Sequence, residues 1–154
     1  MTDSRPARDL EARVIDGSLT EPAFATVLSD LLSRGVRVRF RATGASMAPT
    51  ILDGDAVTVE PIAPARLRRG DVVLARRSGA VVAHRLVARR RDSDGEVHLL
   101  LRGDAADGDD APVAATDALG RVVEVDRAGV RSRPSSPVAR LAALARSLAS
   151  RLRR

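Results

Sequence analysis

Short apolar segments separated by glycine turns dominate the middle of this 154-residue chain. In residues 36–41, valine or phenylalanine alternates with arginine, which is the period of a strand with one buried face. Five further segments are strand candidates, and Asp-Gly, Arg-Gly or Ser-Gly turns lie among them: 55–60, 71–76, 80–91, 96–102 and 119–126. Strands that are this short and closely spaced predict a mainly β, mostly antiparallel domain.

The pattern changes on both sides of this β region, so we expect three parts. Residues 1–35 form an N-terminal arm and helix, residues 36–130 the β domain, and residues 131–154 a linker and a basic amphipathic helix. Residues 136–154 suit contact with an anionic membrane surface, but also packing on the domain or on a partner. Both interpretations stay open at this level.

The N-terminal part carries two helix signals. We expect a short helix around Asp9–Ile15 and a longer one with Thr20 as its N-cap and Pro22 in its first turn. Apolar residues recur through the longer helix at helical spacing, and Gly35 ends it. This helix is expected to pack on the core.

Composition excludes several functions. The chain has no cysteine, which rules out disulfides, thiolate metal sites and a cysteine nucleophile. The net charge is +6, and all 26 basic residues are arginine. A basic chain suits nucleic acid or an anionic membrane surface, but the complete absence of lysine favours a compositional bias, and we expect no nucleic-acid partner. No apolar run approaches the roughly 20 residues of a membrane span. We therefore expect neither a transmembrane helix nor a signal peptide. A cytoplasmic or membrane-peripheral location is the expectation that follows.

The most specific motif in the chain runs from Gly44 to Asp55. Ser46 is followed by Met47, by Pro49 and then by Ile-Leu-Asp-Gly-Asp. Met47 supplies a flexible apolar side chain next to the serine, and Pro49 restricts the turn. The motif predicts a serine hydroxyl at the mouth of a substrate groove bordered by Met47 and Pro49, with an ordinary exposed turn serine as the alternative.

Residues 44–55 resemble the nucleophile box of type I signal peptidases and of the related LexA-type self-cleaving repressors. Four further stretches resemble the other boxes of this superfamily, in the same order: 67–73, 82–87, 101–110 and 119–123. The resemblance covers about residues 36–130. It implies the signal-peptidase/LexA-like β fold and a serine endopeptidase with Ser46 as nucleophile, which removes a signal or leader segment from a precursor.

The general base follows from the same resemblance. Most bacterial signal peptidases and the repressors use lysine, whereas the endoplasmic-reticulum, archaeal and sporulation-type enzymes use histidine. This chain contains no lysine, and His84, followed by Arg85, stands at the position of the base. The resemblance therefore assigns His84 as base and indicates the histidine-type branch. The other histidine, His98, lies in a predicted strand without a motif.

A carboxylate beside the base would complete a Ser-His-Asp site. The resemblance of residues 103–110 to the Gly-Asp box of the histidine-type enzymes favours Asp110, with Asp104 second. Asp107 and Asp109 remain further possibilities, and a solvated acidic loop is the alternative.

The oxyanion hole is expected to use the Ser46 backbone N–H. Many relatives place a second serine two residues before the nucleophile, where this chain has Gly44. A hydroxyl donor is therefore missing unless Thr43 supplies one.

Two other functions compete with general signal-peptide removal. One is a non-catalytic or self-processing LexA-like regulator. The other is a dedicated peptide-maturation peptidase. We expect a precursor protein or leader peptide as substrate, and no cofactor, metal or nucleic acid.

Overall fold

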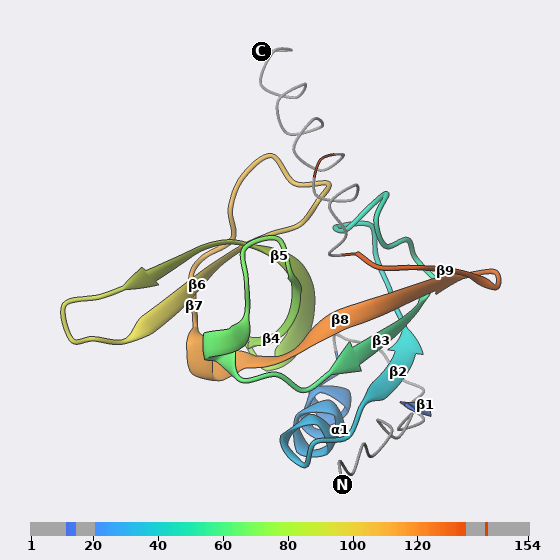
Figure 1. The fold of residues 1–154 in the computed structure, drawn as a ribbon, viewed down its shortest axis with the longest axis horizontal. Helices are drawn as coiled ribbons and strands as arrows, with labels where there is room; N and C mark the ends of the chain where they lie inside the picture. Colours follow the sequence, from blue (N-terminus) through green and yellow to red (C-terminus); the bar gives the residue numbers. More distant parts are fainter. Residues whose placement is uncertain (1–11, 15–20, 135–140, 142–154) are drawn as a thin grey trace, which may run out of the picture.

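The computed structural model describes residues 12–14, 21–134 and 141. Its strands form one curled sheet in the order β1-β2-β3-β8-β4-β5-β6-β7, and β9 pairs with β8 (Figure 1). The strands are β1 (Arg13–Val14), β2 (Val38–Arg41), β3 (Ala56–Glu60), β4 (Val72–Arg77), β5 (Ala80–Arg91), β6 (Val97–Arg102), β7 (Val113–Ala114), β8 (Ala118–Arg127) and β9 (Val130–Ser132). Every pairing is antiparallel except that of β1 with β2. The prediction of a mainly β, mostly antiparallel fold is confirmed, and each predicted strand agrees with an observed one to within two residues.

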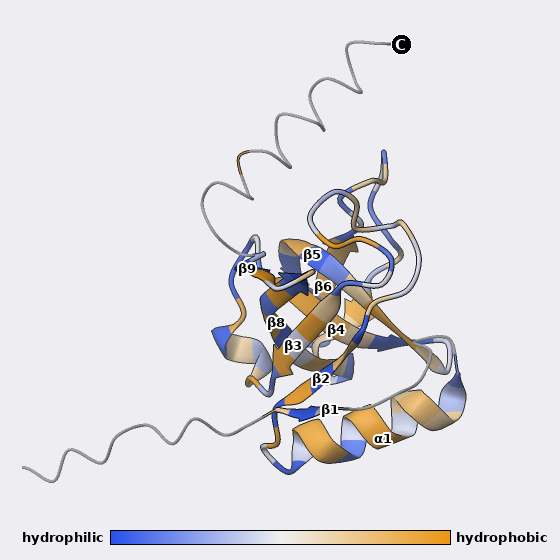
Figure 2. Ribbon diagram, turned by 90° about the vertical axis from the view of Figure 1, so that its right-hand side faces the viewer, coloured by the Kyte–Doolittle hydropathy of each residue, from blue (hydrophilic) through white to orange (hydrophobic). Residues whose placement is uncertain are grey.

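Helix α1 (Pro22–Ser33) packs against the sheet through one apolar face. Leu28 is completely buried, and the rings of Phe24 and Phe40 meet edge to face with their centroids 5.6 Å apart. This geometry is favourable because the positive ring edge meets the negative ring face. Figure 2 shows α1 lying alongside β1 and β2, with hydrophobic and hydrophilic residues interleaved along it. Between residues 21 and 134 the structure also has two single 3₁₀ turns, η1 (Pro64–Arg66) and η2 (Ala115–Asp117).

The N-terminal predictions need two corrections. The N-cap of α1 is Glu21, in extended backbone and without a side-chain cap, rather than Thr20. The helix expected around Asp9–Ile15 is wrong at Arg13–Val14, because these residues form a strand beside β2. The end of α1 follows the prediction, since Gly35 takes a φ of +80° and donates its N–H to Leu32 O at 3.0 Å.

The predicted C-terminal helix lies outside the described residues except for Leu141, which is 68% exposed. Its proposed membrane contact through residues 136–154 stays a prediction. Across the described part of the chain, no helix has the length and apolar character needed to cross a bilayer.

The central strand β4 is buried on both faces and separates two hydrophobic clusters. Val72 and Leu74 belong to a first cluster with α1, β2, β3 and Met47. Val73 and Ala75 belong to a second cluster with β6 and β7. Successive side chains of a strand point to opposite faces, which is why one strand serves both clusters. The loops after β2 and β6 extend from these two clusters.

Candidate active site

Three elements distant in sequence bring Ser46, His84 and Asp110 together. Ser46 lies in the loop between β2 and β3, His84 in β5, and Asp110 in the loop between β6 and β7. The Ser46 Oγ is 3.0 Å from His84 Nε2, and His84 Nδ1 is hydrogen-bonded to Asp110 Oδ2. Ser46 is exposed, whereas the side chains of His84 and Asp110 are only 11% and 15% exposed. The arrangement places a solvent-exposed serine hydroxyl within hydrogen-bonding distance of a largely buried imidazole–carboxylate pair.

Backbone and side-chain contacts fix the position of Asp110. Its N–H donates to Leu101 O at 2.8 Å, and the neighbouring Asp109 accepts a hydrogen bond of 2.7 Å from Arg102 Nε. Arg77, the last residue of β4, places its Nη1 3.2 Å from Asp110 Oδ2. Asp107 is exposed in the same loop. The structure therefore sets Asp110 against His84, and it turns Asp109 towards Arg102.

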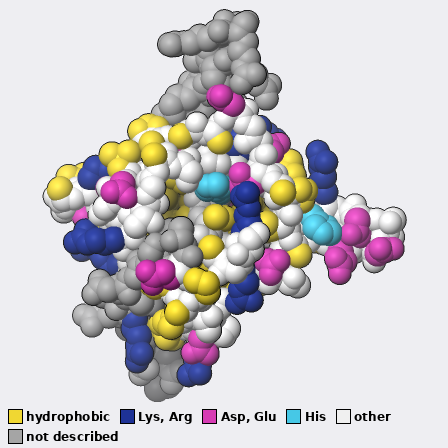
Figure 3. All heavy atoms as spheres, turned by 180° about the vertical axis from the view of Figure 1, so that it is seen from behind, with side chains coloured by type: hydrophobic (Ala, Val, Ile, Leu, Met, Phe, Trp, Pro, Cys, Tyr) yellow, Lys and Arg dark blue, Asp and Glu magenta, His cyan; other side chains and the backbone are white. Residues whose placement is uncertain are grey.

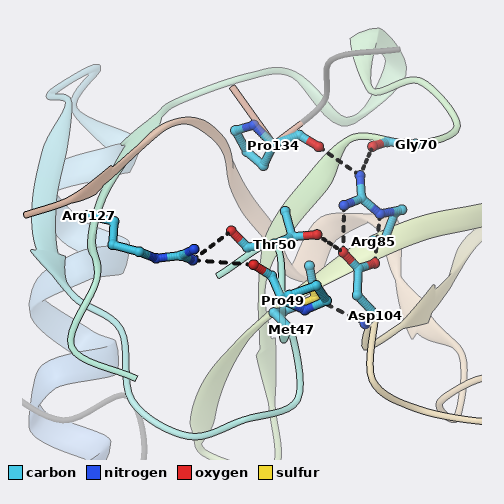
Figure 4. Close-up of polar contacts among 8 residues, drawn as sticks. All are labelled: Met47, Pro49, Thr50, Gly70, Arg85, Asp104, Arg127 and Pro134. Atoms are coloured by element: carbon cyan, nitrogen blue, oxygen red, sulfur yellow. Dashed lines mark hydrogen bonds and ion pairs between the residues drawn. The ribbon is translucent and has the colours of Figure 1, made fainter. Parts of the chain in front are cut away.

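Asp104, the second choice for the carboxylate, is bound elsewhere (Figure 4). Its side chain is 2% exposed, and both of its oxygens accept hydrogen bonds of 2.7 Å from Arg85 Nε and Nη2. Thr50 Oγ1 donates to the same carboxylate at 2.5 Å. Arg85 Nη1 then reaches Gly70 O and Pro134 O, at 2.8 and 2.9 Å. A two-pronged, buried ion pair of this kind fixes the Thr50 segment relative to β5.

The loop that carries Ser46 is ordered by hydrogen bonds to the loop after β6 and to one of its own side chains. The Ser46 carbonyl accepts a hydrogen bond of 3.0 Å from the Ala105 N–H. Gly44 has a φ of +88°, which favours glycine, and donates its N–H to Asp53 Oδ1 at 2.9 Å. The Gly44 amide is thus already engaged, and Gly44 has no side chain to donate. No hydrogen bond within the described residues uses the Ser46 N–H.

A second arginine holds the other end of this loop. Arg127, at the end of β8, donates from Nε and Nη2 to both oxygens of Asp55, at 2.7–3.2 Å, and from Nη2 to Pro49 O at 3.2 Å. These side-chain hydrogen bonds, with the Leu52 N–H, lower the pKa of Asp55 despite the opposing effect of its burial. The carboxylate therefore stays charged at neutral pH.

A small apolar pocket of about 160 Å³ opens beside Ser46 and His84. Its lining comes from β2, β3, β5 and the serine loop: Phe40, Ala42, Thr43, Gly44, Ser46, Met47, Ile51, Val57, Val81, Val82, Ala83 and His84. Met47 lines the pocket, whereas Pro49 is exposed and is not among the lining residues. Figure 3 shows a histidine in the middle of this face with acidic, basic and hydrophobic side chains close by.

Several residues of the site escaped the sequence analysis. Arg77 and Arg127 stand in no motif that distinguishes them from the other arginines of the chain, and Thr50 stands in the serine motif without a role assigned to it. Arg85 and Gly103 lie within the stretches 82–87 and 101–110 that resemble family boxes, so the available signal was their place beside His84 and Asp104. Their contacts depend on segments that only the folded chain brings together.

A different group has the composition of a metal site but lies far along the β5–β6 hairpin. One ligand atom each of Asp92, Glu96 and His98 lies within 4.8 Å of the others. Asp92 Oδ1 already accepts hydrogen bonds from the N–H groups of Asp94 and Glu96, as in a hairpin turn. The contacts of Asp92 are therefore those of a turn residue.

Comparison with known proteins places this arrangement in a family. The model of the family described as Peptidase S24-like matches residues 24–123, which contain Ser46, His84 and Asp110. A search of curated proteins found no match. The match spans most of the chain, from α1 into β8, and the mainly β fold agrees with it. The chain therefore belongs to the Peptidase S24-like family, within the superfamily of LexA-like and signal-peptidase-like serine peptidases.

Proposed function

We propose that this protein is a serine endopeptidase that removes a signal or leader segment from a precursor, with Ser46 as nucleophile, His84 as general base and Asp110 as the carboxylate that orients His84. The observation that carries the proposal is the hydrogen-bonded series from Ser46 Oγ through both nitrogens of His84 to Asp110. Serine is a weak nucleophile on its own and requires an adjacent base. The 3.0 Å distance from Oγ to Nε2 lies within the range for direct proton transfer.

The proposed reaction is a two-step acyl transfer. Ser46 Oγ attacks the carbonyl carbon of the scissile bond while its proton passes to His84 Nε2. The Ser46 N–H donates to the oxyanion of the tetrahedral intermediate. Nε2 then protonates the leaving amine, and the C–N bond breaks to give an ester on Ser46. Water then attacks this ester while His84 accepts its proton; the bond to Ser46 Oγ breaks, and His84 returns the proton to Oγ. Asp110 stabilises the imidazolium in both steps.

The proposed substrate is an extended peptide with a small apolar residue before the scissile bond. From Ala80 to His84, β5 pairs with β4 on one side, and its pairing with β6 begins only at Arg85. In the described part of the chain no strand pairs with the other edge of this half of β5. A peptide can add to a free strand edge through main-chain hydrogen bonds. The adjacent pocket, at about 160 Å³, is suited to a small side chain.

The test is cleavage of a peptide library prepared from a proteome, with new termini identified by mass spectrometry. The wild-type protein should generate termini that follow small residues. Ser46→Ala and His84→Ala should abolish them while the circular dichroism spectrum stays unchanged. Ser93→Ala and His98→Ala, in the β5–β6 hairpin and β6, are the matched controls and should cleave normally. Retention of the same cleavages in Ser46→Ala would overturn the assignment.

The same experiment separates a peptidase that acts on other proteins from a self-processing regulator. Intact mass spectrometry of the purified chain shows whether it cuts itself. A tagged Ser46→Ala chain, mixed with the wild-type protein, shows whether that cut occurs between molecules. Cleavage confined to the protein's own chain would contradict the precursor-processing proposal and favour a self-processing regulator.

A further inference from the structure

Arg77 and His84 contact the same carboxylate oxygen of Asp110. The Asp110 Oδ2 accepts the hydrogen bond of His84 Nδ1, and the Arg77 Nη1 lies 3.2 Å from the same oxygen. Arg77 is opposite Ala80 in the β4–β5 pair, whereas His84 is opposite Val73. Residues 73 and 77 face the same side of β4, so the arginine extends along the face that carries the histidine.

Other charged groups around this pair have partners of their own. On the loop after β6, Asp104 is bound to Arg85 of β5, and Asp109 is bound to Arg102 of β6. Asp107, in the same loop, is exposed. Among the described residues, Arg77 is an arginine that the structure places in contact with Asp110.

Arg76, the preceding residue of β4, extends to the opposite face, where it donates a hydrogen bond to Ser29 Oγ of α1. Arg76 has the same charge as Arg77 and lies in the same strand, but its side chain is on the face away from His84 and Asp110. It provides a matched comparison for any experiment on Arg77.

We propose that Arg77 is a positioning residue, which holds Asp110 Oδ2 against His84 and keeps the imidazole neutral, and so able to act as base, at a lower pH than Asp110 alone would allow. The inference rests on the proposed function of His84. A guanidinium remains charged throughout the pH range in which imidazole titrates. It offsets part of the carboxylate charge that would stabilise an imidazolium and also repels the imidazolium directly. Its effect is moderated by solvent, because the side chain of Arg77 is 38% exposed.

The first test needs no substrate. The chain has two histidines, so in a His98→Gln protein every imidazole NMR signal comes from His84. In this background, Arg77→Gln should raise the midpoint of the His84 titration by about 0.5–1 pH unit. Arg77→Lys should restore much of the original midpoint, and Arg76→Gln should leave it in place. An unchanged or lowered midpoint in Arg77→Gln would overturn the proposal.

The second test uses the peptidase reaction. Arg77→Gln should move the rising limb of the kcat/KM–pH profile upward by the shift measured by NMR. A uniform loss of activity at every pH, with no displacement of the limb, would reduce Arg77 to a structural residue and refute the proposal. An NMR shift in a protein that cleaves no peptide would instead count against the proposed function and leave the inference about Arg77 standing.

Discussion

Gly103 lies directly against the carbonyl group of Ser46. A Cβ atom on Gly103 would stand 2.5 Å from Ser46 O and 3.3 Å from His84 Nε2, and the first distance is shorter than real Cβ contacts allow. The obstacle is a backbone oxygen, which a side-chain rotation cannot move away. The Ala105 N–H donates to the same oxygen at 3.0 Å and keeps the two segments in contact.

Gly103→Ala should therefore displace the serine loop from His84. We expect kcat/KM to fall by about 100-fold or more, since a misplacement of about 1 Å has an effect of that size. Gly108→Ala is the control, because a Cβ there meets no atom within 4 Å and the residue has no positive φ. Kinetics on a cleaved peptide provide the measurement, and a Gly103→Ala protein with normal kcat/KM would contradict the prediction.

The two aspartates proposed for the site should respond differently to substitution. Asp110→Asn should lower kcat by roughly 10²–10⁴-fold with little change in stability, because it removes the charge that supports the imidazolium. Asp104→Ala should instead lower the free energy of unfolding by roughly 3–5 kcal/mol, since it leaves Arg85 buried without its partner. Urea denaturation and steady-state kinetics on both variants measure the difference. Equal stability losses in the two variants would contradict it.

Arg127→Gln should lower the free energy of unfolding at neutral pH, and the loss should be smaller in acid. Arg127 holds the pKa of Asp55 below its ordinary value. This ion pair therefore contributes stability above the ordinary carboxyl pKa, and the contribution is lost as pH falls through the lowered pKa of the folded state. Because the Arg127 side chain is 45% exposed, we expect a loss of only about 1 kcal/mol at pH 7.

The measurement is urea denaturation of the wild-type and Arg127→Gln proteins at pH 7 and at pH 3. The difference in unfolding free energy between them should shrink at the lower pH. Arg131→Gln is the control, because that arginine is 66% exposed and approaches its acidic neighbours only to 3.9 Å. A difference that grows in acid would contradict the assigned direction.

The buried face of helix α1 should account for most of the stability that the helix contributes to the fold. Leu28→Ala should lower the free energy of unfolding by about 2–5 kcal/mol, because Leu28 is completely buried and its truncation leaves a cavity. Val27→Ala, one residue earlier, removes a side chain of a residue that is 46% exposed and should have a small effect. Thermal or urea unfolding compares the two, and similar losses would mean that α1 packs differently.

The main strands were predictable because their signals are local. A short segment rich in apolar residues between two glycine turns identifies a strand such as β5 without knowledge of its partners. The strands β1, β7 and β9 have only two or three residues, too few to show a period. They are strands because β2, β6 and β8 lie beside them, and that information is not local.

The candidate site divides in the same way. Ser46, His84 and Asp110 stand in motifs, so the resemblance could propose them as candidates from the sequence. Arg77 and Arg127 stand in none, and in a chain with 26 arginines the composition cannot show which of them reaches an aspartate. Those contacts join distant segments through long side chains, and only the sheet topology determines them.

The double burial of β4 has a mechanical consequence. Ser46 follows the part of the chain packed in the first cluster, whereas Asp110 lies between Leu101 and Val113 of the second. Their separation is thus set by two cores on opposite faces of one strand, with His84 on the neighbouring strand between them. Slippage of either core relative to β4 would open the Ser46–His84 or the His84–Asp110 contact while most of the sheet stayed paired. Catalytic competence would then be lost in a partial loosening that spectroscopic measures of secondary structure barely register.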